Sequence, residues 1–386
     1  MSIEPWQDPA FVAPPKRVVE SAQGARIVVN GKEVLNFCSN NYLGLASDPR
    51  VRQAAIQAVK EYGVGVGAVR ALSGNSVLHE ELESKLAQFK KAEAALVVQG
   101  GYMANLVAIQ TLMGKEDIVV SDELNHASII DAIRLAQIRS KYIYRHNDMS
   151  SLEEKLREIG ETDKRIMIVT DGVFSMDGDI APLPQIVALA KKYGAITVVD
   201  DAHGEGVLGR GGRGIVDHFN LHGQVDLEVG TLSKAFGVVG GVITGNRKLI
   251  DYLKTKARQY LFSTGLSIPD AGALIEVVEI MSKSEDLVKK LWENAKYLKI
   301  EFEKAGFEIG VSETPITPVM IGDEDKAVLF STKLLEKGVF ATPIKFPMVA
   351  VGKARIRVMP SASHSPKDLE EGVGVFVTVG RELGVI

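Results

Sequence analysis

The chain has 386 residues, 46% of them apolar, with 45 Lys and Arg against 49 Asp and Glu and an isoelectric point near 6.1. This balanced charge excludes a basic surface for nucleic acid or an anionic membrane, no apolar run approaches the ~20 residues that span a bilayer, and a single cysteine, Cys38, excludes an internal disulfide. With no apolar signal core at its N-terminus, the sequence predicts a cytoplasmic globular protein with small-molecule partners.

Helical and strand patterns alternate along the chain. Apolar spacing predicts helices at residues 50–63 and 76–92. Short β-branched runs predict strands at residues 94–99, 117–122, 165–172, 195–203 and 240–245. Because these runs are apolar throughout, we expect an α/β fold with a mostly parallel central sheet covered by helices on both faces.

Three regions are expected. Residues 1–45 form an N-terminal arm, and residues 46–284 form a large cofactor-binding domain. A charged helix begins near residue 285, and the pattern after it predicts a smaller α+β domain over residues 285–386.

Polar residues follow two of the predicted strands, in TDGVFSMDG and in DDAHGEG. Ligands of open α/β sheets bind at the carboxyl ends of the strands, so these segments should converge. Asp200, Asp201 and His203 lie in the second segment, and Lys234 follows in the turn GTLSKAFG. Singly, an Asp here is more often a cap and a His more often structural. Together they are typical of a Schiff-base cofactor site.

Pyridoxal phosphate needs this set of groups. A lysine tethers the cofactor as an imine, and a buried carboxylate keeps its ring nitrogen protonated so that the ring accepts electrons. A lysine with its ordinary pKa of about 10.4 would stay protonated and inert. The small and apolar neighbours of Lys234 lower that pKa by desolvation.

Two more segments fit a flat, phosphorylated cofactor. VVQGGYMANL is a strand, a Gly-Gly turn and a helix start, whose free N–H groups suit a phosphate. His126 opens another predicted helix, where its ring is placed to stack on the cofactor or simply to cap the helix. The competing segment GVGVGA, residues 63–68, matches a relaxed dinucleotide fingerprint, but a helix precedes it where a strand is required.

The sequence resembles the α-oxoamine synthases, pyridoxal-phosphate enzymes of the aspartate-aminotransferase fold that condense an amino acid with an acyl-CoA. The motifs that carry the resemblance are NFCSNNYLGLASDP, TDGVFSMDGDIAPL, VVDDAHGEGVLG, GTLSKAFG, YLFSTGLSIP and KARIRVMPSASH, in matching order from about residue 16 onward.

The resemblance implies a role for each matching residue. Lys234 would bind pyridoxal 5'-phosphate covalently, Asp200 pair with its ring nitrogen, His203 bond its phenolate oxygen and His126 stack on its face. The remaining residues would hold the cofactor or the substrate: Ser175, Gly101, Tyr102 and Thr231 the cofactor, Phe262 and Ser263 the phosphate of the partner subunit in a homodimer, and Arg357, assisted by Asn40, the substrate carboxylate.

The motifs are most similar to the glycine C-acetyltransferase branch, also called 2-amino-3-ketobutyrate CoA ligase. They therefore predict an acyltransferase of amino-acid metabolism that condenses glycine with acetyl-CoA to give 2-amino-3-oxobutyrate and CoA. The alternatives are an 8-amino-7-oxononanoate synthase, which joins L-alanine to pimeloyl-CoA with decarboxylation, or a synthase of broad acyl range. An aminotransferase on the same fold, and a subunit that has lost catalysis, are weighed against these; the presence of Lys234 disfavours the latter.

Overall fold

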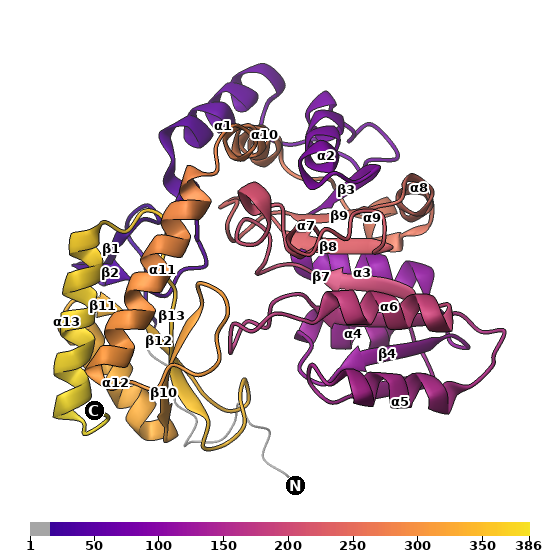
Figure 1. Cartoon of the computed structure of the whole chain (residues 1–386). Coiled ribbons are helices and arrows are strands. Elements are labelled where there is room, and N and C mark those ends of the chain that lie inside the picture. The colour runs from indigo at the N-terminus through magenta and orange to yellow at the C-terminus, as the bar shows by residue number, and fades with distance from the viewer. Residues whose placement is uncertain (1–15) are drawn as a thin grey trace, which may run out of the picture.

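The structure, a computed structural model, describes residues 16–386, so that the first 15 residues of the predicted arm lie outside it. Figure 1 shows two lobes: a large one around a central sheet and a smaller one built from the C-terminal third of the chain, with α1 and α10 at the top between them. Within the described residues, no helix is long and apolar enough to cross a membrane.

The central sheet has seven strands in the order β3-β9-β8-β7-β6-β4-β5 within the described residues. Its members are β3 (Ala94–Val98), β4 (Ile118–Asp122), β5 (Ser140–Tyr144), β6 (Ile166–Asp171), β7 (Ile196–Asp200), β8 (Leu227–Thr231) and β9 (Gly241–Gly245). All run parallel except β9, which is antiparallel to both of its neighbours. The predicted mostly parallel sheet is therefore present.

Both faces of this sheet are buried, as the uninterrupted apolar runs predict. In β3, Ala95 and Val97 belong to one apolar core, whereas Leu96 and Val98 belong to a second core on the opposite face. This alternation follows from the two-residue period of a strand. The strand side chains are thus fixed on both sides, and the carboxyl ends of β4, β6, β7 and β8 are held at one edge.

Helices surround the sheet, and α1 and α10 pack against each other at its upper end. The helices are α1 (Pro49–Tyr62), α2 (Val77–Lys90), α3 (Gly101–Leu112), α4 (Ala127–Leu135), α5 (Met149–Ile159), α6 (Leu183–Tyr193), α7 (Ile215–His218), α8 (Arg247–Lys256), α9 (Arg258–Leu261) and α10 (Ile268–Lys283), with the short 3-10 turns η2 (Leu45–Ser47) and η3 (Arg210–Gly212). Most begin with a side-chain cap, such as Ser76, whose hydroxyl accepts a bond from the N–H of Leu78 at 3.3 Å.

The small lobe contains α11 (Asp286–Ala305), β10 (Thr317–Gly322), α12 (Glu324–Glu336), β11 (Val339–Phe340), β12 (Thr342–Ile344), β13 (Ala354–Val358) and α13 (Pro366–Glu382). Strands β10, β13 and β12 form an antiparallel sheet. From the predicted arm, β2 (Lys32–Asn36) pairs in parallel with β11 and antiparallel with β1 (Arg26–Val29) on its other side. Leu35 and Phe37 thereby enter the core of the small lobe. The domain boundaries themselves stay predictions.

Candidate active site

A pocket of about 320 Å³ lies at the carboxyl ends of the central strands. It is lined by eight of the residues singled out in the sequence: Gly101, Tyr102, His126, Ser175, Asp200, His203, Thr231 and Lys234. These residues come from five separate segments of the chain. Their convergence follows from the parallel strands, which deliver every following loop to the same edge of the sheet.

Lys234 lies in a tight turn after β8. The N–H of Gly237 bonds to the carbonyl of Lys234 at 3.0 Å, and the N–H of Val238 bonds to the carbonyl of Leu232 at 3.0 Å. Gly237 has a φ of 73°, and a Cβ there would stand 2.4 Å from the backbone nitrogen of Ala46, so only glycine closes the turn. Burial lowers the pKa of Lys234 to about 8, although Asp200 and Asp171 act in the opposite direction.

Asp200 is the last residue of β7 and its side chain is buried. One carboxylate oxygen accepts a bond from Asn105 Nδ2 at 2.6 Å, and the other accepts from the N–H of Ala202 at 3.0 Å. Asn105 also donates to Ser128 Oγ at 2.9 Å. Its neighbour Asp201 does not line this pocket and instead faces Lys90. The geometry therefore favours Asp200 over Asp201 as the anion of the site.

His126 is the N-cap of α4, and its ring Nδ1 lies 2.7 Å from Ser128 Oγ. Its backbone N–H donates to Asp171 at 2.9 Å, which fixes the start of the helix against the end of β6. Burial lowers the pKa of the His126 imidazole. The same residue thus caps the helix and lines the pocket, so the two interpretations of the sequence are compatible.

His203 is buried beside the pocket, and its Nδ1 lies 2.8 Å from the hydroxyl of Tyr42. Burial and the nearby cations of Lys234 and Arg357 lower the pKa of His203 well below its usual range. A neutral imidazole with one nitrogen engaged by Tyr42 has its other nitrogen free for a further hydrogen bond.

At the other end of the pocket, Gly101 begins α3 and packs against Thr231, whose Cβ would be 2.8 Å from a Cβ at position 101. Thr231 and Ser233 place their hydroxyls 2.8 Å apart beside the N–H groups of this helix. A helix N-terminus with free N–H groups and adjacent hydroxyls suits a phosphate. Tyr102 is half exposed, and its hydroxyl donates to Asp131.

Four predicted residues do not line the pocket within this chain. Arg357, on β13, donates to the carbonyl of Ser175 at 3.0 Å and so reaches the pocket wall from the small lobe. Asn40 has a buried side-chain oxygen with no partner. Phe262 is 74% exposed, and Ser263 accepts a bond from Gln99 Nε2 at 3.0 Å.

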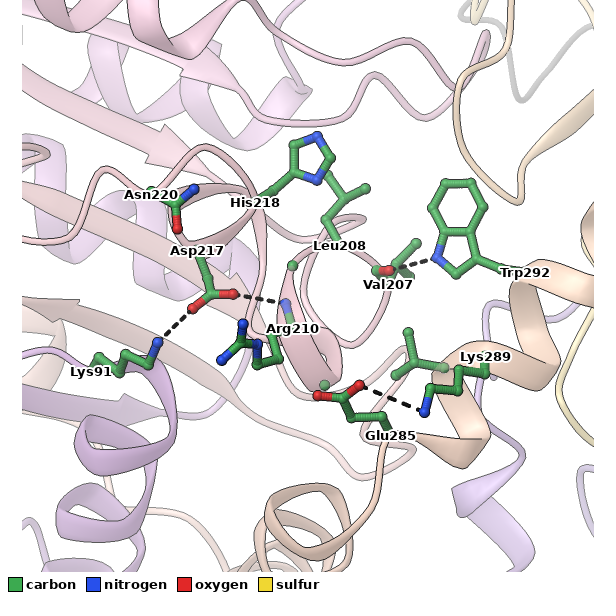
Figure 2. Close-up of a pocket in the computed structure, with 13 residues that line it drawn as sticks. Lys91, Val207, Leu208, Arg210, Asp217, His218, Asn220, Glu285, Lys289 and Trp292 are labelled. Atoms are coloured by element: carbon green, nitrogen blue, oxygen red, sulfur yellow. Dashed lines mark hydrogen bonds and ion pairs between the residues drawn. The ribbon is translucent and has the colours of Figure 1, made fainter.

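A second hollow of about 560 Å³ lies elsewhere, between η3 and α11 (Figure 2). Four of its charged side chains form two ion pairs: Lys91 with Asp217 at 3.1 Å and Lys289 with Glu285 at 3.8 Å. None of the predicted site residues lines it. We therefore assign the chemistry to the smaller pocket.

The sequence analysis missed three side chains of the site. Asp171 ends β6 as Asp200 ends β7, so the strand-end argument that found Asp200 applies to it equally. Asn105 is a buried amide in a mostly apolar helix, and a buried polar side chain is an informative exception. Tyr42 bonds to His203 across 161 positions, and no sequence pattern reveals a contact of that range.

The donor set fits pyridoxal phosphate. Lys234 offers an amine of lowered pKa, Asp200 a buried carboxylate, and the start of α3 a phosphate cradle in which any residue larger than Gly101 would displace Thr231. These three groups line one pocket, as a cofactor bound at its aldehyde, ring nitrogen and phosphate requires.

The family model of aminotransferase class I and II matches residues 32–376. The chain therefore belongs to this family, and both the predicted fold and the predicted cofactor, pyridoxal 5'-phosphate, are confirmed. A solved serine palmitoyltransferase from S. paucimobilis with a bound PLP-myriocin aldimine superimposes with a TM-score of 0.92 at 33% identity, covering 96% of this chain and 94% of that one.

Curated relatives place the chain among the α-oxoamine synthases within this family. The 8-amino-7-oxononanoate synthase of Fervidobacterium nodosum is 59% identical over 373 residues, which cover 96% of this chain and 94% of the relative. That of Petrotoga mobilis is 58% identical over 371 residues, with the same coverage. The chain is an enzyme of the pyridoxal-phosphate-dependent acyltransferase type.

The predicted condensation of glycine with acetyl-CoA is wrong. Eight curated relatives, 51 to 59% identical, are all 8-amino-7-oxononanoate synthases. The motifs behind the prediction are those expected to hold the cofactor and the substrate carboxylate, through Lys234, Asp200, Thr231 and Arg357. Such residues carry no information on the amino-acid side chain or on the acyl chain.

Proposed function

We propose that this enzyme condenses L-alanine with pimeloyl-CoA, releasing CoA and carbon dioxide and forming 8-amino-7-oxononanoate. The observation that supports this most strongly is the agreement of the eight relatives over at least 95% of this chain. The pocket supplies the groups that the reaction requires, namely a lysine of lowered pKa, a buried carboxylate and a phosphate cradle.

Bound pyridoxal phosphate supplies an electron sink that stabilises negative charge at the α-carbon of the amino acid. Asp200 holds a proton on the ring nitrogen, because its carboxylate is fixed by Asn105 and by the N–H of Ala202. His203, kept neutral by burial, serves as hydrogen-bond partner to the ring oxygen and is itself oriented by Tyr42.

Lys234 has two tasks in this proposal. Its amine binds the cofactor aldehyde in the resting enzyme, and, once released, its Nζ takes the α-proton of the amino acid. A pKa of about 8 suits both tasks, because a useful fraction of the amine is unprotonated near neutral pH.

Arg357 binds the carboxylate of L-alanine, with its guanidinium anchored on the carbonyl of Ser175. His126 covers the neighbouring face and excludes water from it. This carboxylate later leaves as carbon dioxide. We therefore expect Arg357 to hold it while the amino acid binds, and the carboxylate to rotate away from Arg357 before the C–C bond breaks.

The small lobe offers apolar contacts for the acyl chain. Phe346 and Met348 lie in the segment between β12 and β13, and they are 58% and 52% exposed. Phe340 instead packs against the small cluster of Ile27, Val29 and Val34. We therefore include Phe346 and Met348, but not Phe340, in the proposed acyl entrance.

The proposal includes a homodimer in the cytoplasm, with the active site shared between subunits. The large exposure of Phe262 supports this, because a side chain of this size stabilises a protein only when it is covered. The predicted boundaries of the arm and the two domains are retained in this proposal.

The test is a product assay. Purified holoenzyme is supplied with L-alanine or glycine together with pimeloyl-CoA or acetyl-CoA, in all four pairs, and CoA, carbon dioxide and the amino ketone are measured. We expect L-alanine with pimeloyl-CoA to be used most efficiently, with equal amounts of CoA and carbon dioxide. A better rate with another pair, or CoA release without carbon dioxide, would contradict the proposal.

A further inference from the structure

His146 lies outside the pocket, in the turn between β5 and α5, and nothing in the reaction uses it directly. Its ring is wedged between two carboxylates: Nδ1 is 3.0 Å from Asp122 Oδ1, and Nε2 is 2.8 Å from Asp179 Oδ2. A carboxylate oxygen accepts hydrogen bonds and does not donate them. Both ring nitrogens must therefore carry protons, so the geometry defines an imidazolium.

The surroundings of the ring support that state. The charged groups that contact the ring are Asp122, from β4, and Asp179, from the loop after β6, and the carboxylate of Glu123 accepts a bond from the backbone N–H of His146 at 2.8 Å. Burial alone would lower the pKa of His146, but the hydrogen bonds and charges of the two carboxylates outweigh burial and raise the pKa to about 10. The ring of Phe174 packs edge-on against it at 4.3 Å between centroids.

Each of the two carboxylates belongs to a segment that carries a site residue. Asp122 ends β4, and the turn that follows leads directly to His126; its carboxylate also accepts bonds from the N–H groups of Leu124 and Asn147, at 2.9 and 3.0 Å. This turn is further tied to the sheet, because the side-chain oxygen of Asn125 accepts from the N–H of Asp171 at 2.7 Å.

Asp179 lies in the loop that carries Ser175. Its carbonyl accepts a bond from the N–H of Phe174 at 3.0 Å, and its carboxylate also accepts from Asn147 Nδ2 at 2.8 Å. Ser175 follows Phe174 and presents its carbonyl to Arg357. A displacement of Asp179 would therefore move the anchor of the proposed carboxylate-binding arginine.

We propose that His146 is a positioning residue of this active site, whose imidazolium joins Asp122 to Asp179 and so holds the turn before His126 and the loop of Ser175 in register. The proposal concerns the site of the proposed function and rests on it only for the choice of L-alanine as probe. Without the cation, two carboxylates would face each other across the gap and repel.

The test compares His146→Gln with His222→Gln. His222 is a matched control, because it pairs with Asp217 at 2.9 Å and its side chain is 26% exposed against 24% for His146, but it lies away from the pocket. For each holoenzyme we would measure the absorption band of the cofactor, the dissociation constant of L-alanine from the change in that band, and the melting temperature.

We expect both variants to melt lower than the parent, and only His146→Gln to shift the band and to weaken L-alanine binding, by about 10-fold to 100-fold, as misplacement of a binding group does. Adding Asp179→Asn to His146→Gln removes the repulsion and should restore part of the affinity. A simple loss of stability would not be reversed in this way.

Nitrogen NMR of the parent protein gives a readout that needs no substrate. At pH 8 we expect both ring nitrogens of His146 to be protonated, with and without cofactor. A neutral His146, or equal effects of the His146 and His222 variants on the band and on L-alanine binding, would overturn the proposal. If L-alanine does not bind the parent, the proposed substrate fails, while the NMR state and the band shift still decide the role of His146.

Discussion

At Asp200 the protein buries a carboxyl group that accepts two hydrogen bonds, from Asn105 Nδ2 and from the N–H of Ala202. The adjacent Asp171 differs, because burial and the charge of Asp200 raise its pKa well above the usual range. Two carboxyl groups at neighbouring strand ends thus differ in their surroundings: Asp200 lines the pocket between two donors, whereas Asp171, with its raised pKa, accepts a bond from the N–H of His126.

We predict that Asp200→Asn loses at least about 100-fold in kcat/KM, near 2.7 kcal/mol, because the charge that holds the ring proton is gone. The new amide would also place its NH₂ group against one of the two hydrogen-bond donors, Asn105 Nδ2 or the N–H of Ala202. Asp171→Asn is the matched control, and we expect it to lose less than about 10-fold, since an amide oxygen replaces a neutral carboxyl as acceptor. Equal losses in the two variants, measured with cofactor bound, would contradict this assignment.

At the scale of elements, a buried cation joins α2 to the ends of two strands. Lys90 ends α2, and its Nζ lies 2.9 Å from Glu228 in β8 and 3.5 Å from both Asp201 and Glu205 after β7. The carboxylates overcome the effect of burial and raise the pKa of Lys90, whereas burial raises the pKa of Glu205 to about 7. Asp201, a member of this cluster, directly follows Asp200 in the chain.

We predict that Lys90→Met lowers the free energy of unfolding by about 3–5 kcal/mol at pH 8, because it leaves buried carboxylates without their cation. A carboxyl group whose pKa is raised by folding binds a proton more tightly in the folded protein than in the unfolded chain. For Glu205, the free energy of unfolding therefore falls as pH rises from about 4.5, its pKa in the unfolded chain, through its folded pKa. The deficit should therefore be smaller at pH 6 than at pH 8.

Urea unfolding at pH 6, 7 and 8 checks this expectation. The control is Lys91→Met, the next residue, whose pair with Asp217 is half exposed and should contribute less than about 1 kcal/mol. A deficit for Lys90→Met that is independent of pH, or no larger than that of the control, would show that Lys90 does not neutralise the cluster.

The elements themselves were largely readable from the sequence. The helices predicted at residues 50–63 and 76–92 are α1 and α2, and the continuous apolar runs are strands buried on both faces. The strand-end argument located Asp200, but it could not reveal that Asp201 turns to Lys90, a contact that depends on how α2 packs. Long-range contacts such as Tyr42 with His203 have no local signal.

At the scale of the whole molecule, the sequence motifs did not predict the choice of substrate correctly. Cofactor chemistry is set by a few groups at fixed places, so Lys234, Asp200 and the start of α3 stand out as a pattern. The fit of an acyl chain depends instead on the shape of surfaces such as the loop of Phe346 and Met348, where any apolar residue of suitable size satisfies the same pattern.

Phe262 and Ser263 bear on whether a single chain forms a complete active site. Phe262 is 74% exposed, and Ser263 does not line the pocket of its own chain, where Gly101 and Thr231 form the proposed phosphate cradle. If Ser263 serves the neighbouring subunit, each active site combines Lys234 from one chain with Ser263 from the other. A two-fold symmetric dimer then contains two such sites.

We predict that two inactive variants, Lys234→Ala and Ser263→Glu, regain activity when mixed after dissociation. The glutamate should repel the phosphate held by the partner. Each heterodimer then has one site with both lesions and one site with neither. Because random pairing makes about half of the dimers heterodimers, about a quarter of the parent activity should return. Mixing Lys234→Ala with Asp200→Asn is the control. Lys234 and Asp200 line the same pocket within a chain, so each of the two sites of that heterodimer carries one lesion. Mass spectrometry would verify that heterodimers have formed in both mixtures. If they form and the first mixture remains as inactive as the second, Ser263 acts within its own subunit.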